Sequence, residues 1–367
     1  MNDSWIAKKA ALLAGYSLRL RPGDLLVLES TPAAGPLVRQ VYREALRAGA
    51  HVRLKIGLEE LEEIFYKHAS DEQLTFVSDL DRAEVERMDA SLRIVAPLNP
   101  KALTGVDPSR QVGYFRAHGP LREIFFGRSG RGELRWCLTR HPTHADAQEA
   151  EMSLGEFEEF VARAEFLDQV DPLAAWETLS ARQRAQCEFL EGVRALEVRA
   201  PDTDLRMGVA GRRWFNSDGR RNFPSGEVFT GPVEDSVEGH IRFTFPALYR
   251  GREVTDVRLT FEKGRVVNAE AAHGREFLEA MLGTDAGARY VGEFAFGNNE
   301  AITRFSKIIL FDEKIGGTVH LALGSSYPET GGKNRSAIHW DMICDLRQGG
   351  EVRADGQVIH RDGRWVI

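Results

Sequence analysis

Hydrophobic and polar residues follow two different patterns along this chain, and the change falls near its middle. In the first half, three short apolar runs have the length and composition of buried strands, at residues 24–30, 51–56 and 90–97. Residues 36–50 carry an apolar stripe at helical spacing, with Pro36 suited to the first turn, and residues 70–80 predict another helix. Strands that alternate with helices favour a parallel, layered α/β structure.

Two further helices are predicted before the pattern changes. Residues 152–169 open with Ser153 and Glu156 at the spacing of a capping box, and an apolar stripe follows. Residues 171–193 form a longer helix with Asp171 as the N-cap. We place the domain junction at the end of this helix, which gives an α/β scaffold domain at 1–193 and a second domain at 194–367.

The second half alternates apolar and polar residues every two positions, as half-buried antiparallel strands do. Such segments occur at 203–209, 241–245, 256–261 and 265–271. The last two are separated by Lys263 and Gly264, which signal a hairpin. A single helix at 274–283 interrupts the strands. We therefore expect a β-rich α+β domain.

Composition excludes several classes of protein. The chain has 367 residues, of which 43% are hydrophobic and 28% charged, as in ordinary globular proteins, and a net charge of −7 argues against a nucleic-acid partner. Three widely spaced cysteines do not form a thiolate zinc site or a disulfide framework. No apolar run is long enough for a membrane span, and the N-terminal residues do not resemble a secretory leader. The expected location is the cytoplasm.

The first half lacks the phosphate-binding loops of nucleotide folds. The segment after the first strand, "STPAAGP", matches neither G-x-G-x-x-G nor G-x-x-x-x-G-K-[ST]. The chain also lacks H-E-x-x-H and G-x-S-x-G. The α/β domain is therefore predicted to be a scaffold.

Candidate metal ligands gather instead in the second domain, within 115 positions of each other. They are Glu227 after a Pro-Ser-Gly turn, Glu293 among aromatic residues, His320 in an apolar strand, and His339 with Asp341 in "IHWDM". Side chains two apart share a face of a strand, so His339 and Asp341 point the same way. A carboxylate buried among apolar residues needs a partner.

Taken singly, each of these residues has an ordinary structural explanation, such as a solvated loop glutamate or a hydrogen-bonded core histidine. Taken together, imidazole and carboxylate ligands suit zinc, manganese, iron or cobalt better than calcium. Three carboxylates with two histidines fit two divalent ions that share a bridging carboxylate and activate water. Tyr327 either donates to a developing oxyanion or packs as a loop aromatic.

Four segments resemble the M29 family of metalloaminopeptidases, also called the thermophilic aminopeptidase family. They are "SLRLRPGDLLVLES", "NFPSGEVFTGPVEDSVEGHIRF", "YVGEFAFGNN" and "GGTVHLALGSSYPETGGKNRSAIHWDM". The resemblance implies an N-terminal α/β domain, a C-terminal metal-binding domain, a homodimer and peptide substrates. It also implies two divalent metal ions (zinc, cobalt, manganese or magnesium) held by Glu227, Glu293, His320, His339 and Asp341. Glu293 would be the bridging ligand or the base, and Tyr327 the catalytic tyrosine. The segment between Tyr327 and His339 is shorter than this family leads us to expect.

Two alternatives remain open from the sequence. Ring-cleaving dioxygenases of dihydroxypyridines share this appearance, and they use two histidines and one aspartate on a single iron, which here would be His320, His339 and Asp341. The presence of both Glu227 and Glu293 favours the two-metal hydrolase. A protein that binds metal or peptide without catalysis is the third possibility.

Overall fold

The computed structural model describes residues 1–249 and 251–367, which form two compact units. The first unit contains residues 1–173 and 219–223, and the second contains 174–218 and 224–367. The boundary therefore precedes nearly all of the helix that we placed in the first domain. This helix belongs with the second unit because its polar side chains bind that unit: Gln183 donates to the carbonyl oxygens of Ser217 and Glu227.

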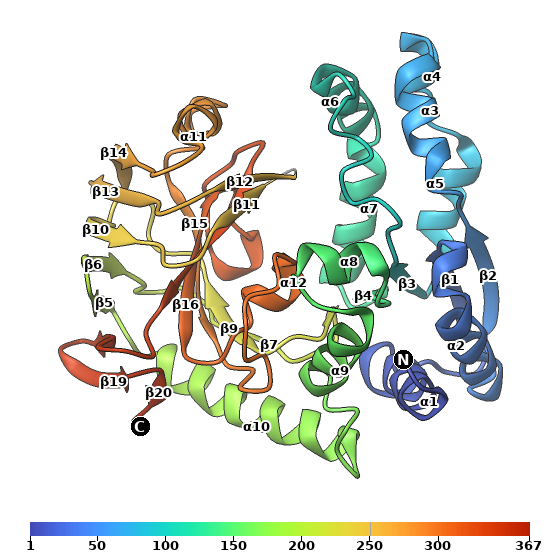
Figure 1. Ribbon diagram of the computed structural model, residues 1–367, viewed down its shortest axis with the longest axis horizontal. Helices are drawn as coiled ribbons and strands as arrows, with labels where there is room; N and C mark the ends of the chain where they lie inside the picture. Colours follow the sequence, from blue (N-terminus) through green and yellow to red (C-terminus); the bar gives the residue numbers. More distant parts are fainter. Residues whose placement is uncertain (250) are drawn as a thin grey trace. The chain divides into compact units, whose positions relative to one another are not determined.

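The first unit is built on a parallel five-stranded sheet in the order β2-β1-β3-β4-β8, as expected for a layered α/β fold (Figure 1). The strands are β1 (Leu25–Ser30), β2 (His51–Ile56), β3 (Ala90–Val95), β4 (Arg135–Arg140) and β8 (Asn222–Phe223). The helices are α1 (Asp3–Leu12), α2 (Gly35–Arg47), α3 (Glu60–His68), α4 (Asp71–Thr75), α5 (Asp79–Arg87), α6 (Pro108–Ala117), α7 (Gly119–Gly130), α8 (His144–Glu149) and α9 (Leu154–Ala164). Single turns η1 (Leu13–Ser17) and η2 (Pro32–Ala34) complete it.

Most predicted elements of this unit are present, and a helix does begin after Ser70, but it does not continue through residue 80. The structure divides it into α4 and α5, because Phe76 is extended and Ser78 caps a new helix by accepting from the Leu80 N–H. The predicted capping box of Ser153 and Glu156 is confirmed at the start of α9. Strands β4 and β8 were not predicted, and β8 has only two residues, which carry no periodic signal.

The second unit contains two antiparallel sheets. The larger has the order β14-β13-β10-β6-β5-β18-β19-β20, and the smaller has the order β17-β16-β15-β9-β7. The larger sheet comprises β5 (Ala195–Ala200), β6 (Thr203–Gly208), β10 (Glu238–Arg242), β13 (Arg258–Glu262), β14 (Arg265–Glu270), β18 (Glu351–Ala354), β19 (Gln357–Arg361) and β20 (Arg364–Trp365). The smaller comprises β7 (Phe215–Ser217), β9 (Glu227–Thr230), β15 (Val291–Gly297), β16 (Thr318–Gly324) and β17 (His339–Asp345).

The remaining elements of this unit are a two-stranded ribbon, three helices and one turn. They are β11 (Ala247–Tyr249), β12 (Arg252–Val254), α10 (Pro172–Leu190), α11 (Arg275–Leu282), α12 (Ile309–Asp312) and η3 (Pro328–Thr330). The predicted hairpin is confirmed: Lys263 and Gly264 join β13 to β14, and both have positive φ, as a type I′ turn requires.

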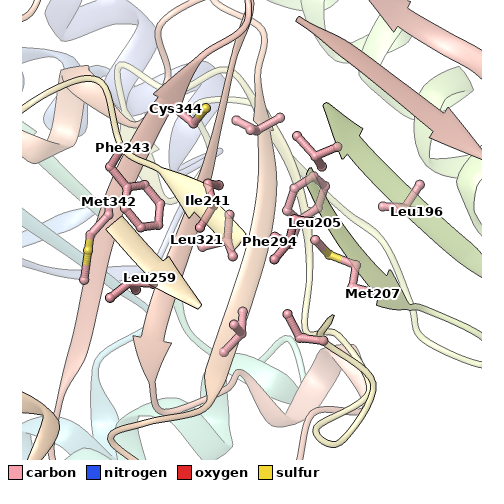
Figure 2. Packing of buried hydrophobic residues seen from close by; sticks show 14 of the residues in the cluster. Leu196, Leu205, Met207, Ile241, Phe243, Leu259, Phe294, Leu321, Met342 and Cys344 are labelled. Carbon is pink, nitrogen blue, oxygen red and sulfur yellow. The ribbon is translucent and has the colours of Figure 1, made fainter. Parts of the chain in front are cut away.

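One hydrophobic cluster fills the space between the two sheets of the second unit. Figure 2 shows ten labelled members, with Phe294 and Leu321 of the smaller sheet gathered with Leu205 and Ile241 of the larger one. In β16 and β17 every second residue enters this cluster, so the residues between them point to the opposite face. In β15 a bulge follows Val291, and Phe294 and Phe296 enter the cluster beyond it. None of the helices formed by residues 1–249 and 251–367 is long and apolar enough to cross a membrane.

Candidate metal centre

The candidate metal ligands lie on the face of the smaller sheet that points away from the hydrophobic cluster. Because side chains alternate, Val319 and Leu321 face the cluster and His320 between them faces the other way, as predicted. By the same rule His339 and Asp341 of β17 share this face, and so do Glu227 of β9 and Glu293 of β15. The structure thus brings together five residues from four adjacent strands.

Small residues form the floor between these side chains. The register places Ala322 of β16 directly between Asp341 and Glu293, and it places Ala295 beside His320. His339 lies opposite Gly324. A larger residue at any of these three positions would fill the space into which the carboxylates and imidazoles converge.

Glu293 lies at the centre of the group. Its Oε1 is 3.6 Å from the Nε2 of His320, and its Oε2 is 3.3 Å from the Nε2 of His339. The Glu227 Oε2 is 3.4 Å from the same His320 nitrogen, and the Asp341 Oδ1 is 3.6 Å from that of His339. Two triads therefore share Glu293: one with Glu227 and His320, the other with His339 and Asp341.

Several of these atoms lack hydrogen-bond partners in the described part of the chain although they are buried. The Glu227 Oε2 and the His320 Nδ1 accept or donate no hydrogen bond there, and their residues are 4% and 1% exposed. The His339 Nδ1 donates to the Ser325 carbonyl oxygen at 2.8 Å, so Nε2 is the ring nitrogen that faces the carboxylates and can bind an ion once it loses its proton. Unpaired buried oxygens and aligned imidazoles fit bound cations.

Before any ion binds, imidazoles and carboxylates hold each other in the charged form. Burial alone would lower the pKa of His320, but Glu293 and Glu227 outweigh it and raise this pKa to about 9. Burial opposes ionisation of Glu293 as well, but His320 and His339 hold its pKa below the usual value. Asp341 is shifted in the same direction, because its attraction to His339 overcomes burial.

Tyr327 follows β16 in the loop before η3, beside this group. Its ring centroid is 5.2 Å from that of His339 and 5.5 Å from that of Phe229. Although Tyr327 is 41% exposed, desolvation of its hydroxyl and the negative charge of Glu293 and Asp341 raise the pKa of the phenol above the usual value. The phenol therefore keeps its proton at neutral pH and can donate it in a hydrogen bond.

The sequence did not predict two neighbouring residues, Glu313 and Lys314. Glu313 follows α12, and its carboxylate forms a third metal-compatible group with His320 and Asp341. The buried Lys314 Nζ donates to the Glu227 Oε1 at 2.5 Å and to the Glu313 carboxylate. The signal available in the sequence was an acid–base pair, "DEK", placed immediately before the apolar strand that holds His320.

Fold and site together point to a metalloprotein, since three overlapping groups of imidazole and carboxylate side chains among the described residues could hold a metal ion. The family model described as thermophilic metalloprotease (M29) matches residues 2–365, and the chain belongs to this family. It is therefore a metal-dependent peptidase. Aminopeptidase 2 of Geobacillus stearothermophilus is 32% identical over 98% of this chain and 97% of its own length. Aminopeptidase T of Thermus thermophilus is 28% identical over 99% and 98%, respectively.

Solved structures agree with this assignment. Wild-type AmpT from Thermus thermophilus matches with a TM-score of 0.84 at 26% identity and covers 99% of both chains. The 2,5-dihydroxypyridine dioxygenase of Pseudomonas putida KT2440 has a TM-score of 0.61 at 16% identity over 99% of this chain and 96% of its own. The second similarity shows a shared fold and carries no assignment of activity.

Proposed function

We propose that this protein is an aminopeptidase that removes N-terminal residues from peptides with two divalent ions. The observation that carries the proposal is the position of Glu293, whose two carboxylate oxygens face different histidines, His320 and His339. A carboxylate in this position suits a bridge between two ions. The relatives are named aminopeptidases, which supports cleavage at the N-terminal end of the peptide.

The ligands divide into two sets that share this bridge. Glu227, Glu293 and His320 would hold one ion, and Glu293, His339 and Asp341 the other, with Glu313 available beside His320 and Asp341. When bound, such ions supply a nucleophilic water at neutral pH and polarise the scissile carbonyl. Imidazole and carboxylate donors suit zinc, cobalt or manganese, and magnesium where carboxylates dominate.

The chain's own groups have separate tasks. Glu293 would either be a ligand shared by both sites or accept a proton from water, and the direction of its two oxygens toward His320 and His339 supports the shared ligand. Tyr327 keeps its phenolic proton and can donate a hydrogen bond to the oxygen of the carbonyl under attack. His339 is held in one tautomer by Ser325, which fixes the orientation of the ring.

The test is metal content per chain together with hydrolysis of an aminoacyl anilide after addition of cobalt, zinc or manganese. We expect close to two ions and metal-dependent release of the aniline. An N-acetylated anilide is the matched control, because an aminopeptidase does not cleave a substrate with a blocked amine. One iron without hydrolysis would support the ring-cleaving dioxygenase, and metal without any turnover of peptides would support a binding protein.

Homodimerisation, expected from the family resemblance, stays a prediction. Light scattering at micromolar concentration measures it directly, and a monomer under these conditions would contradict it.

A further inference from the structure

Lys314 is a buried cation in direct contact with the proposed metal centre. It follows α12 by two residues and is 1% exposed. Its ammonium group donates to Glu227 on one side and to Glu313 on the other. Glu227 belongs to one of the ligand groups and Glu313 to another, so a single ammonium links carboxylates of two different groups.

The contact divides the two oxygens of Glu227 between two partners. The Oε1 is 2.5 Å from the Lys314 Nζ, and the Oε2 is 3.4 Å from the His320 Nε2 and makes no hydrogen bond within the described residues. Lys314 therefore leaves one oxygen of this carboxylate free to face an ion.

The position of the Lys314 ammonium is important because many negative charges gather at this site. Glu227, Glu293, Glu313 and Asp341 converge on a small volume with two imidazoles. Mutual repulsion of buried carboxylates destabilises the folded chain unless cations lie among them. An ammonium supplies part of that positive charge permanently, whereas metal ions supply it only when bound.

We propose that Lys314 is a built-in counter-ion of the metal centre, which stabilises the metal-free site and weakens its affinity for metal ions. This inference rests on the proposed function, because it takes Glu227 and Glu313 to be at the centre. The same positive charge that replaces a missing ion repels an arriving one. Lys314 is thus a positioning residue that sets how readily metal exchanges.

Removal of the ammonium has two opposite effects on metal affinity. Loss of the contact that orients Glu227 weakens metal binding, and loss of the repulsion between the ammonium and the metal ion strengthens it. The second effect is larger. Glu227 stays confined by its own burial, at 4% exposed, so it loses little orientation. Repulsion between a unit charge and a divalent ion a few ångströms away is strong in a buried site. Replacement of Lys314 by an uncharged residue of similar shape is therefore expected to strengthen metal binding, on the order of tenfold or more.

The experiment compares Lys314→Met with the wild type by calorimetric titration with Co²⁺ and by thermal unfolding with and without Co²⁺. We expect the K314M dissociation constant for Co²⁺ to fall by about tenfold or more. We also expect the Tm of the metal-free variant to drop by several degrees, and most of this loss to be recovered when Co²⁺ is bound. An ordinary structural lysine would lower both Tm values equally and would not tighten metal binding.

Lys9→Met is the matched control. Lys9 is also fully buried and pairs with a buried carboxylate, that of Glu165, but both belong to the first unit and not to the metal centre. K9M is expected to lower the Tm equally with and without Co²⁺ and to leave Co²⁺ affinity unchanged.

A double variant keeps the test decisive if K314M folds poorly. Glu313→Gln combined with K314M removes one negative charge together with the ammonium, so the metal-free Tm should recover relative to K314M. No recovery, or Co²⁺ binding by K314M that is unchanged or weaker than wild type, would overturn the role of Lys314. Failure of the wild type itself to bind Co²⁺ would instead reject the metal centre and the proposed function with it.

Discussion

Glu293 and His339 lie on strands that are separated by a third strand, yet the Glu293 Oε2 and the His339 Nε2 are only 3.3 Å apart. Strands β15 and β17 flank β16, and two inter-strand spacings amount to roughly 9–10 Å. The side chains close this gap by leaning over Ala322 and Gly324, which leave space above the sheet. Both side chains can reach a single metal ion because the strand between them has only small residues, Ala322 and Gly324, at this point.

Glu293→Gln is expected to abolish peptidase activity while preserving the fold. The amide keeps the shape of the side chain but loses the negative charge that faces both histidines, so we expect turnover to fall by about a thousandfold or more. Anilide hydrolysis measures the activity, and circular dichroism measures the fold. The control is Glu329→Gln, which changes an exposed carboxylate in η3. This variant should keep the activity and the fold of the wild type. Hydrolysis by E293Q at the wild-type rate would remove Glu293 from the mechanism.

Tyr327→Phe removes one hydroxyl and keeps the ring that packs on Phe229 and His339. If the phenol donates to the carbonyl oxygen under attack, kcat should fall by about a hundredfold, with little change in KM. Metal content per chain should equal that of the wild type, which separates loss of a donor from loss of an ion. A kcat within a factor of two of the wild type would show that Tyr327 is only a packing residue.

Gly226→Ala is expected to displace the backbone before Glu227 and so to move the Glu227 carboxylate out of the candidate metal centre. Gly226 has a φ of +129°, and an added Cβ would lie 2.7 Å from the Asn299 Cβ. We expect a loss of about 2–4 kcal/mol in the free energy of unfolding, together with weaker Co²⁺ binding.

The matched control for this variant is Gly211→Ala. Gly211 also has a positive φ, +72°, but nothing lies within 4 Å of an added Cβ. Backbone strain alone should cost about 1–2 kcal/mol there. Urea unfolding compares the two variants, and equal losses would mean that the contact with Asn299 does not constrain Glu227.

Acidification is expected to destabilise the second unit through His360. Burial lowers the pKa of this histidine to about 4, against about 6.5 in an unfolded chain. The unfolded state therefore binds the proton first as pH falls. Stability is complete above pH 6.5 and is lost progressively toward pH 4, by about 3 kcal/mol.

His360→Phe tests this prediction, because it keeps an aromatic ring against Phe296 and Trp365 and cannot bind a proton. Urea unfolding at pH 7 and pH 4.5, in the presence of chelator, should show a smaller loss on acidification than in the wild type. His141 of the first unit has the same kind of shift, so part of the acid sensitivity should remain. An identical loss in H360F and wild type would contradict the assignment to His360.

The sequence predicted many of the helices and strands that have a clear period, but no element between residues 97 and 152, where β4, α6 and α7 lie. Strand alternation identified the face shared by His339 and Asp341, and helical spacing with a capping box identified α9. Strand β8 was missed because its two residues have no period, and they join a sheet formed by residues more than 80 positions earlier. Only the folded chain reveals such a pairing.

The candidate site shows the same division. Glu227, Glu293, His320, His339 and Asp341 stand on strands, where the period of two indicates direction, and family resemblance selected them. Glu313 and Lys314 follow a four-residue helix and lie in no periodic segment. The contact of Lys314 with Glu227 depends on tertiary structure across 87 positions of sequence, which no local pattern encodes.

The alternation of β16 has a consequence for how this protein succeeds or fails in folding. His320 points to the candidate metal centre because Val319 and Leu321 point to the core, so a slip of one residue would turn two apolar side chains toward the charged groups and the imidazole into the hydrophobic core. Errors of strand pairing are thus disfavoured by the same hydrophobic forces that assemble the core. Packing of Val319 and Leu321 into the core therefore also directs the His320 imidazole toward the neighbouring carboxylates.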